Sequence, residues 1–187
     1  MKVFILMFML AVTAQSYAIE ISDVKLDEKI QLDKYPLVLN GAGVRKKFLI
    51  KAYVGALYLH EKTRFADNVL ADTGAKRMAY FMLRDVPGQQ VLDRINEAIV
   101  ANNSLDEMKV LEKRFYEFEK IFLKIPQVKK GDIITLDYIP GIGTRVSFNN
   151  VDKGSIEGAE FYRSLLKTWV GSKPIQASLK KSVLGEE

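Results

Sequence analysis

Residues 37–60 read LVLNGAGVRKKFLIKAYVGALYLH. The Gly-Ala-Gly segment at 41–43 predicts a turn, because glycine is one of the strongest turn signals. The β-prone run at 48–59 then predicts the longest strand of the chain, and a central one, because part of it is apolar on both faces. Arg45 and Lys47 are two residues apart, so on a strand they would share one face.

Phenolic side chains follow these cations, since Tyr53 and Tyr58 stand within the apolar run. A cleft lined by apolar and phenolic groups around a fixed charge is typical of a small-molecule site. The alternative interpretation is an ordinary edge hairpin whose cations are solvated. The stretch by itself leaves both interpretations open.

The first 18 residues have the pattern of a secretory signal peptide. Lys2 supplies the positive start, an apolar segment follows at 3–12, and Ser16-Tyr17-Ala18 is a small-x-small cleavage site. An uncleaved membrane anchor is the less favoured alternative, because the apolar run is short for a bilayer span. We therefore expect residues 1–18 to be removed after Ala18 and residues 19–187 to form one periplasmic domain.

Composition narrows the classes of function. The chain has 28 Lys and Arg, 23 Asp and Glu, and a formal net charge of +5, but charges of both signs are mixed and no basic block indicates nucleic-acid binding. It has no cysteine, which excludes a disulfide frame and a thiolate metal site. His60 is the single histidine, too few for a histidine metal site. We expect a monomer that uses no metal and no cofactor.

The remaining pattern predicts strands early and late in the chain with helices between them. Expected helices cover residues 65–70, 87–101, 105–125, 158–170 and 175–183, the third starting at a capping box of Ser104 and Glu107. Expected strands lie within 24–32, at 37–39 after a turn at Pro36, and at 76–84, 133–139 and 144–148, with Ile156 in a further strand or turn. The fold class is therefore α+β with a mostly antiparallel sheet.

Catalytic and nucleotide-binding motifs are absent from the sequence. Gly41-x-Gly43 lacks a third glycine and leads into a predicted strand, so it is not a dinucleotide fingerprint. There is no P-loop, H-E-x-x-H or G-x-S-x-G segment. The residues left that could support chemistry are a cation, two phenols and a hydroxyl: Arg45, Tyr53, Tyr58 and Thr168.

Several segments together resemble the chalcone isomerase family, which includes plant flavonoid enzymes, fatty-acid-binding relatives and bacterial chalcone-isomerase-like proteins. The resemblance runs from Val24 to Gly185 and rests on the order and spacing of G-A-G-V-R at 41–45, K-A-Y-x-G-x-L-Y-L at 51–59, Pro87-Gly88-Gln89-Gln90, Gly131-Asp132 and Thr168-x-x-Gly171. It implies an open-faced β-sandwich, in which a large antiparallel sheet carries a layer of helices on one face, with the ligand cleft between them.

The resemblance also implies which residues bind ligand. Arg45 matches the family arginine that binds the ligand and steadies a developing negative charge, and Thr168 matches a late threonine. A family threonine falls at Tyr53, whose hydroxyl could serve instead. The family's helix tyrosine and asparagine fall at Val91 and Ala98, so the polar network that holds a chalcone ketone is lost. We predict a ligand-binding site and assign no catalytic residue.

Three hypotheses about function follow. The first is a periplasmic chalcone-isomerase-like protein that binds a small amphipathic or aromatic anion, similar to a fatty acid, in a cleft between sheet and helices with Arg45 as its charge partner. The alternative is an isomerase of the intramolecular lyase type acting on an enone-like substrate. A structural or partner-binding factor with a vestigial cleft is the third.

Overall fold

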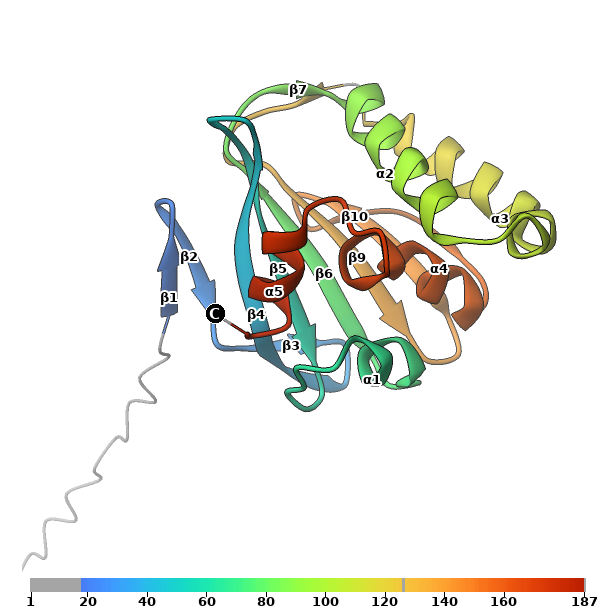
Figure 1. Cartoon of the computed structure of the whole chain (residues 1–187), viewed down its shortest axis with the longest axis horizontal. Helices are drawn as coiled ribbons and strands as arrows, with labels where there is room; N and C mark the ends of the chain where they lie inside the picture. The colour runs from blue at the N-terminus through green and yellow to red at the C-terminus, as the bar shows by residue number, and fades with distance from the viewer. Residues whose placement is uncertain (1–17, 126, 187) are drawn as a thin grey trace, which may run out of the picture.

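A seven-stranded antiparallel sheet organises the protein, in the strand order β11-β10-β9-β6-β5-β4-β3 (Figure 1). The structure is a computed structural model and describes residues 18–125 and 127–186, so the predicted leader up to residue 17 lies outside the described residues. The strands of the sheet are β3 (Lys29–Leu32), β4 (Tyr35–Lys47), β5 (Ile50–Leu59), β6 (Lys76–Met82), β9 (Ile133–Ile139), β10 (Gly143–Phe148) and β11 (Val151–Ile156). Two short antiparallel ribbons pair β1 (Ala18–Ile21) with β2 (Val24–Asp27), and β7 (Val86–Pro87) with β8 (Gln127–Val128).

Helices cover one face of this sheet (Figure 1). They are α1 (Ala66–Ala71), α2 (Gly88–Asn102), α3 (Leu105–Phe122), α4 (Ala159–Val170) and α5 (Ala177–Val183). The predicted capping box starts α3, because Ser104 Oγ accepts from the Glu107 amide at 3.2 Å and the Glu107 carboxylate accepts from the Ser104 amide at 2.7 Å. The antiparallel sheet with helices on one face confirms the predicted α+β, open-faced architecture.

The central strand β5 shows how the sequence serves two faces. Tyr53 and Leu57 lie in the large core under the helices, whereas Val54, Ala56 and Tyr58 lie in a smaller core on the opposite face. Side chains alternate along a strand, which is why this run is apolar in both registers. Tyr58 consequently faces away from Tyr53, and the two phenols cannot share one cleft.

The predicted Gly-Ala-Gly turn is wrong, because these residues lie inside β4. Gly41 is paired with Leu57, and Gly43 with Gly55. A Cβ atom added at Gly41 would lie 2.1 Å from the backbone oxygen of Ser182, and one at Gly43 would lie 2.5 Å from the Ser182 Cβ. Because these glycines have no side chain, α5 can pack directly against the strand. Close approach of another backbone is a recognised reason for glycine within a strand.

The predicted strand at 48–59 is wrong at its start. Lys47 pairs with Ile50, so Phe48 and Leu49 form the two-residue turn between β4 and β5 and β5 begins at Ile50. This turn lacks glycine, proline, asparagine and aspartate, the residues that predict turns. The expected turn at Pro36 is also displaced, because Pro36 is paired within β4 and the chain reverses before it.

Candidate functional site

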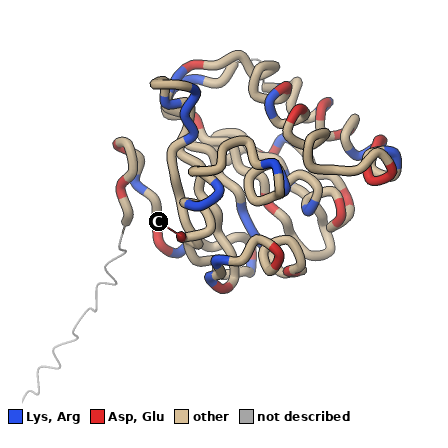
Figure 2. The backbone as a smooth tube through the Cα atoms, viewed as in Figure 1, with Lys and Arg blue, Asp and Glu red and all other residues tan. Residues whose placement is uncertain are grey.

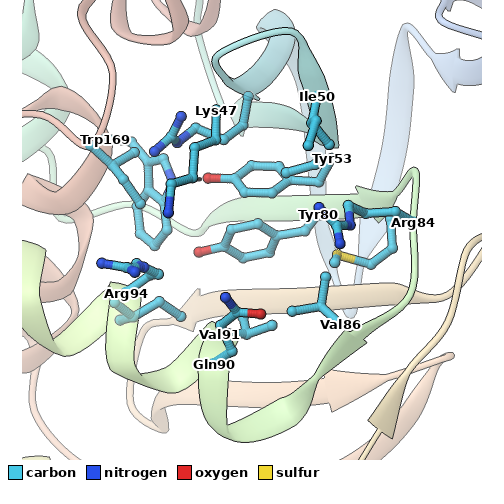
Figure 3. Close-up of a pocket in the computed structure, with 15 residues that line it drawn as sticks. Lys47, Ile50, Tyr53, Tyr80, Arg84, Val86, Gln90, Val91, Arg94 and Trp169 are labelled. Carbon is cyan, nitrogen blue, oxygen red and sulfur yellow. Dashed lines mark hydrogen bonds between the residues drawn. The ribbon is translucent and has the colours of Figure 1, made fainter.

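A cavity lies between the sheet and the helix layer, near the end of the sheet at which β4 and β5 meet (Figure 3). About 120 Å³ of it is open to the centres of water molecules. Its walls come from β4, β5 and β6, the chain after β6, the first half of α2, and single residues of and after α4. The lining residues are Arg45, Lys47, Ile50, Ala52, Tyr53, Tyr80, Met82, Arg84, Val86, Gln90, Val91, Arg94, Ile95, Trp169 and Ile175.

Three buried aromatic side chains form one wall of the cavity. The ring centroids of Tyr53 and Tyr80 are 5.0 Å apart, those of Tyr80 and Trp169 are 5.2 Å apart, and both pairs are edge-to-face. The Trp169 indole N–H donates to the Tyr53 hydroxyl at 3.2 Å. In Figure 3 both phenol hydroxyls point to the same side, where Trp169 and Arg94 stand.

Both phenols stay protonated at neutral pH. Burial raises the pKa of Tyr53 to about 12, although the bond from Trp169 and the charge of Arg45 oppose the shift. Burial raises the pKa of Tyr80 well above its usual value, and the Tyr80 hydroxyl has no hydrogen-bond partner within residues 18–125 and 127–186. Since a buried hydroxyl is normally paired, Tyr80 is a donor available to a ligand in the cavity.

Cations surround this aromatic wall. Arg45, Lys47, Arg84 and Arg94 line the cavity, and none of its 15 lining residues is an acid. Arg94 is paired with Glu97, an exposed carboxylate one helical turn further along α2, at 2.6 Å. Positive groups beside a partly water-excluded cavity attract an anion more strongly than the same groups in open solvent.

A second, more open hollow adjoins the cavity, with about 300 Å³ available to water centres. Its lining residues are Arg45, Lys47, Arg94, Glu97, Ala98, Lys173, Pro174 and Ile175. Three of the four cavity cations line both spaces. The charges therefore stand at the border between an apolar compartment and a solvent-facing one, which is the arrangement that an amphipathic anion requires.

Gln176 fixes the position of Arg45, and the sequence pattern did not reveal it. Its side-chain oxygen accepts from Arg45 Nη1 at 3.0 Å and from the Lys46 amide at 2.8 Å. Its side-chain nitrogen donates to the Val44 carbonyl at 3.2 Å and to Ser178 Oγ at 2.6 Å. The segment before α5 is thereby attached to β4 beside the cavity.

The structure brings two of the three predicted site residues together. Arg45 and Tyr53 line the cavity, as does Val91. Thr168 is fully buried and does not line it, and its hydroxyl has no partner among the described residues. Its neighbour Trp169 faces the cavity instead. Ligand binding by Arg45, Tyr53 and Thr168 stays a prediction.

Sequence reasoning missed Tyr80, Arg84, Arg94 and Trp169. Tyr80 and Arg84 belong to the KRMAYFMLR segment, in which period-2 spacing places every second residue on the helix side. That alternation was a usable signal once Tyr53 had been chosen. Trp169 and Arg94 gave no comparable signal, because an aromatic residue on a helical stripe and a cation on a helix surface are both commonplace.

The described residues also bear on metal binding and on membrane insertion. No group of three or more histidine, cysteine, aspartate or glutamate side chains in residues 18–125 and 127–186 is placed to hold a metal ion. In the same residues no helix is both long and apolar enough to cross a bilayer.

The fold and the cleft define a class of protein: an antiparallel sheet with helices over one face and a cation-rimmed, apolar cleft between the two layers. The chain belongs to the chalcone isomerase-like family, whose model matches residues 18–185. A solved structure with a similar fold is AtFAP1, a fatty-acid binding protein of Arabidopsis thaliana, with a TM-score of 0.72, 15% sequence identity, and coverage of 91% of this chain and 97% of that one. No curated protein matched the chain.

Proposed function

We propose that this protein binds a small amphipathic anion of the fatty-acid class in the cleft. The observation that carries the proposal is the set of four cations, without an acid, around an aromatic and apolar cavity. The anionic group lies at Arg45, Lys47 and Arg94, and the apolar part lies against the aromatic wall. The fatty-acid binding protein that shares the fold supports this ligand class.

The test is a titration with a fluorescent fatty acid. A charge-assisted hydrogen bond contributes about 1.5–3 kcal/mol, so Arg45→Ala should weaken binding by roughly tenfold to a hundredfold. Arg45→Lys should recover part of the affinity, because an ammonium lacks the planar two-donor fork. Arg64→Ala removes an exposed arginine that does not line the cleft and is the matched control. Equal affinities in all four proteins would contradict the proposal.

A second candidate is an isomerase of the intramolecular lyase type, which the unpartnered Tyr80 hydroxyl favours. Together with Tyr53 and Arg45 it could donate to a developing enolate or phenolate oxygen. Val91 in the wall offers no hydrogen bond, and we expect naringenin chalcone to decay only at its spontaneous rate. If wild type removes the chalcone absorbance band faster than the spontaneous rate and Arg45→Ala does not, the enzyme would be favoured.

The proposed place of action is the periplasm, after removal of residues 1–18. The motive is the signal-peptide pattern that ends at Ala18. N-terminal sequencing of protein from the periplasmic fraction should begin at Ile19, and native mass spectrometry of the same sample should show a co-purified anionic amphiphile. Recovery of an intact Met1 from the membrane fraction would contradict the location but not the ligand.

A further inference from the structure

The turn that joins β4 to β5, which we call the tip, consists of residues 46–51 with the sequence KKFLIK. Phe48 is 89% exposed, Leu49 is 97% exposed and Ile50 is 54% exposed. The other large exposed apolar residues of the described chain are separate from one another in the sequence. Scattered exposed apolar residues need no explanation, but three in a row at the end of a hairpin do.

The tip also breaks the chemistry of its own turn. Phe48 has φ 55°, and Leu49 is not in the positive-φ region, so the positive φ falls on the first residue of a two-residue loop. A type II′ hairpin turn gives that position to glycine. A bulky residue at positive φ costs free energy, and such costs are concentrated at functional sites. The hairpin therefore keeps two large apolar side chains in water at the expense of its own stability.

Positive charge surrounds these apolar side chains. Lys46, Lys47 and Lys51 lie within the tip, and no acidic residue occurs between Lys34 and His60. Figure 2 shows lysine and arginine gathered at this end of the β4–β5 ribbon. Apolar side chains flanked by cations are the combination that binds the interface of an anionic lipid bilayer.

The tip is continuous with the cleft, since Lys47 and Ile50 line the cavity described above. A second copy of the chain is a poor occupant for the tip, because contact between two tips would bring six lysines together. The two turn residues alone also offer far less than the roughly 1,000 Å² that a stable protein interface buries.

We propose that the tip docks this protein on an anionic lipid surface. Phe48 and Leu49 enter the acyl-chain boundary, and the lysines contact the headgroups. Docking rests on the tip residues alone. The further consequence, that the cleft then faces the bilayer from which an amphipathic ligand is taken or to which it is delivered, rests on the proposed function.

The test is flotation of the protein with vesicles of phosphatidylcholine and phosphatidylglycerol in equal parts. Phe48→Gly with Leu49→Ser gives the turn its preferred residue and should keep the fold, as a thermal melt would verify. Each inserted side chain contributes tenfold or more, so this pair should weaken binding by about a hundredfold. Leu105→Ser with Val110→Ser, at exposed positions of α3, is the matched control and should bind like wild type.

The charge contribution has its own pair of variants. Lys46→Gln with Lys51→Gln should weaken binding roughly thirtyfold, since each cation near an anionic surface contributes about 1 kcal/mol. Neither lysine lines the cavity. Lys109→Gln with Lys113→Gln on α3 is the control. Wild-type binding should likewise be weaker to vesicles of pure phosphatidylcholine, and weaker when salt is added.

Three flotation results would overturn the proposal. They are wild-type protein that stays unbound, tip variants that float like wild type, and α3 controls that lose as much binding as the tip variants. Light scattering that shows a wild-type dimer and a monomeric tip variant would assign the tip to a second copy and overturn it as well. Titration with the fluorescent fatty acid separates the two proposals. Wild-type protein that floats but binds no fatty acid contradicts only the proposed function, whereas tip variants that bind the fatty acid like wild type and still float like wild type contradict only docking.

Discussion

The two faces of the sheet treat charge in opposite ways. On the face away from the helices, Asp137 is fully buried and accepts from the Arg77 guanidinium at 2.6 and 2.7 Å, with Arg145 at 3.9 Å. Arg145 is in turn paired with Asp33 at 2.8 Å. On the helix face, four cations line a cavity, and none of the described residues that line it is an acid. The first arrangement satisfies itself, whereas in the second the negative charge would come from the proposed ligand.

This difference separates charges that stabilise the fold from charges that we assign to ligand binding. Arg77, Asp137 and Arg145 stand opposite one another on β6, β9 and β10, so the sheet register itself pairs them. A buried charge without a partner is strongly destabilising, which explains why this row is complete. A cleft that gathers four cations and leaves the buried Tyr80 hydroxyl without a partner among the described residues gains nothing for stability, so we expect the gain to be in binding.

The largest expected effect is on the paired face. Asp137→Ala leaves Arg77 partly buried without its carboxylate, and breaking a buried pair in this way costs about 3–5 kcal/mol of unfolding free energy. Ligand affinity should not change, because Asp137 is not in the cleft. Urea unfolding measures the first and a fluorescent fatty acid the second. Asp106→Ala, which removes an exposed carboxylate near Lys109, should cost little. A small loss in Asp137→Ala would break the comparison.

Much of this fold was predictable from the sequence, for identifiable reasons. Helices whose start is a chemical signal, as at Ser104, were placed correctly because the capping box acts locally. The Gly41–Gly43 segment was misassigned because its cause is remote: α5, from the end of the chain, packs against it. Phe48 and Leu49 were misassigned because the tip does not follow turn chemistry at all, and a rule cannot predict its own violation.

The site was predictable in part. Arg45 and Tyr53 were candidates from the strand pattern and were supported by the family resemblance, but the cavity is completed by residues from β6, α2 and α4 that meet only in three dimensions. Tyr58 shows the limit of a linear motif. It is an odd number of residues from Tyr53 along the strand, so its side chain lies on the face away from the helices. Gln176 shows another, since an amide that orients an arginine from 131 positions away leaves no local pattern.

A second prediction uses the pH dependence of stability to test the buried phenol of Tyr53. Since the pKa of Tyr53 is about 12 in the folded protein and near 10 in the unfolded chain, its contribution is present below pH 10 and is lost as pH rises toward 12. The full loss, reached above pH 12, amounts to about 3 kcal/mol for two pKa units. Tyr53→Phe should lessen the decline in unfolding free energy over that range. Bound ligand should delay the decline in wild type but not in Tyr53→Phe, and an equal delay in both would contradict the site.

A third prediction exchanges one arginine on each face. Arg84→Gln removes a cation from the cavity wall and should weaken binding of a fluorescent fatty acid about fivefold to tenfold, with unfolding free energy changed by less than about 0.5 kcal/mol. Arg145→Gln breaks the pair with Asp33 and should lower stability by about 1 kcal/mol without changing affinity. The comparison fails if both variants alter the same property.

The smallest expected effect is the most diagnostic. Tyr80→Phe removes a buried hydroxyl that has no partner among the described residues. The ligand-free protein should therefore be unchanged or more stable by up to about 1 kcal/mol, while affinity for a fluorescent fatty acid falls about fivefold. Tyr162→Phe is the matched control, because that hydroxyl is equally buried but donates to the Leu136 carbonyl at 3.1 Å. It should lose about 1 kcal/mol of stability and no affinity. If Tyr80→Phe instead destabilises the protein and binds ligand normally, Tyr80 is an ordinary core residue and its hydroxyl does not donate to the ligand.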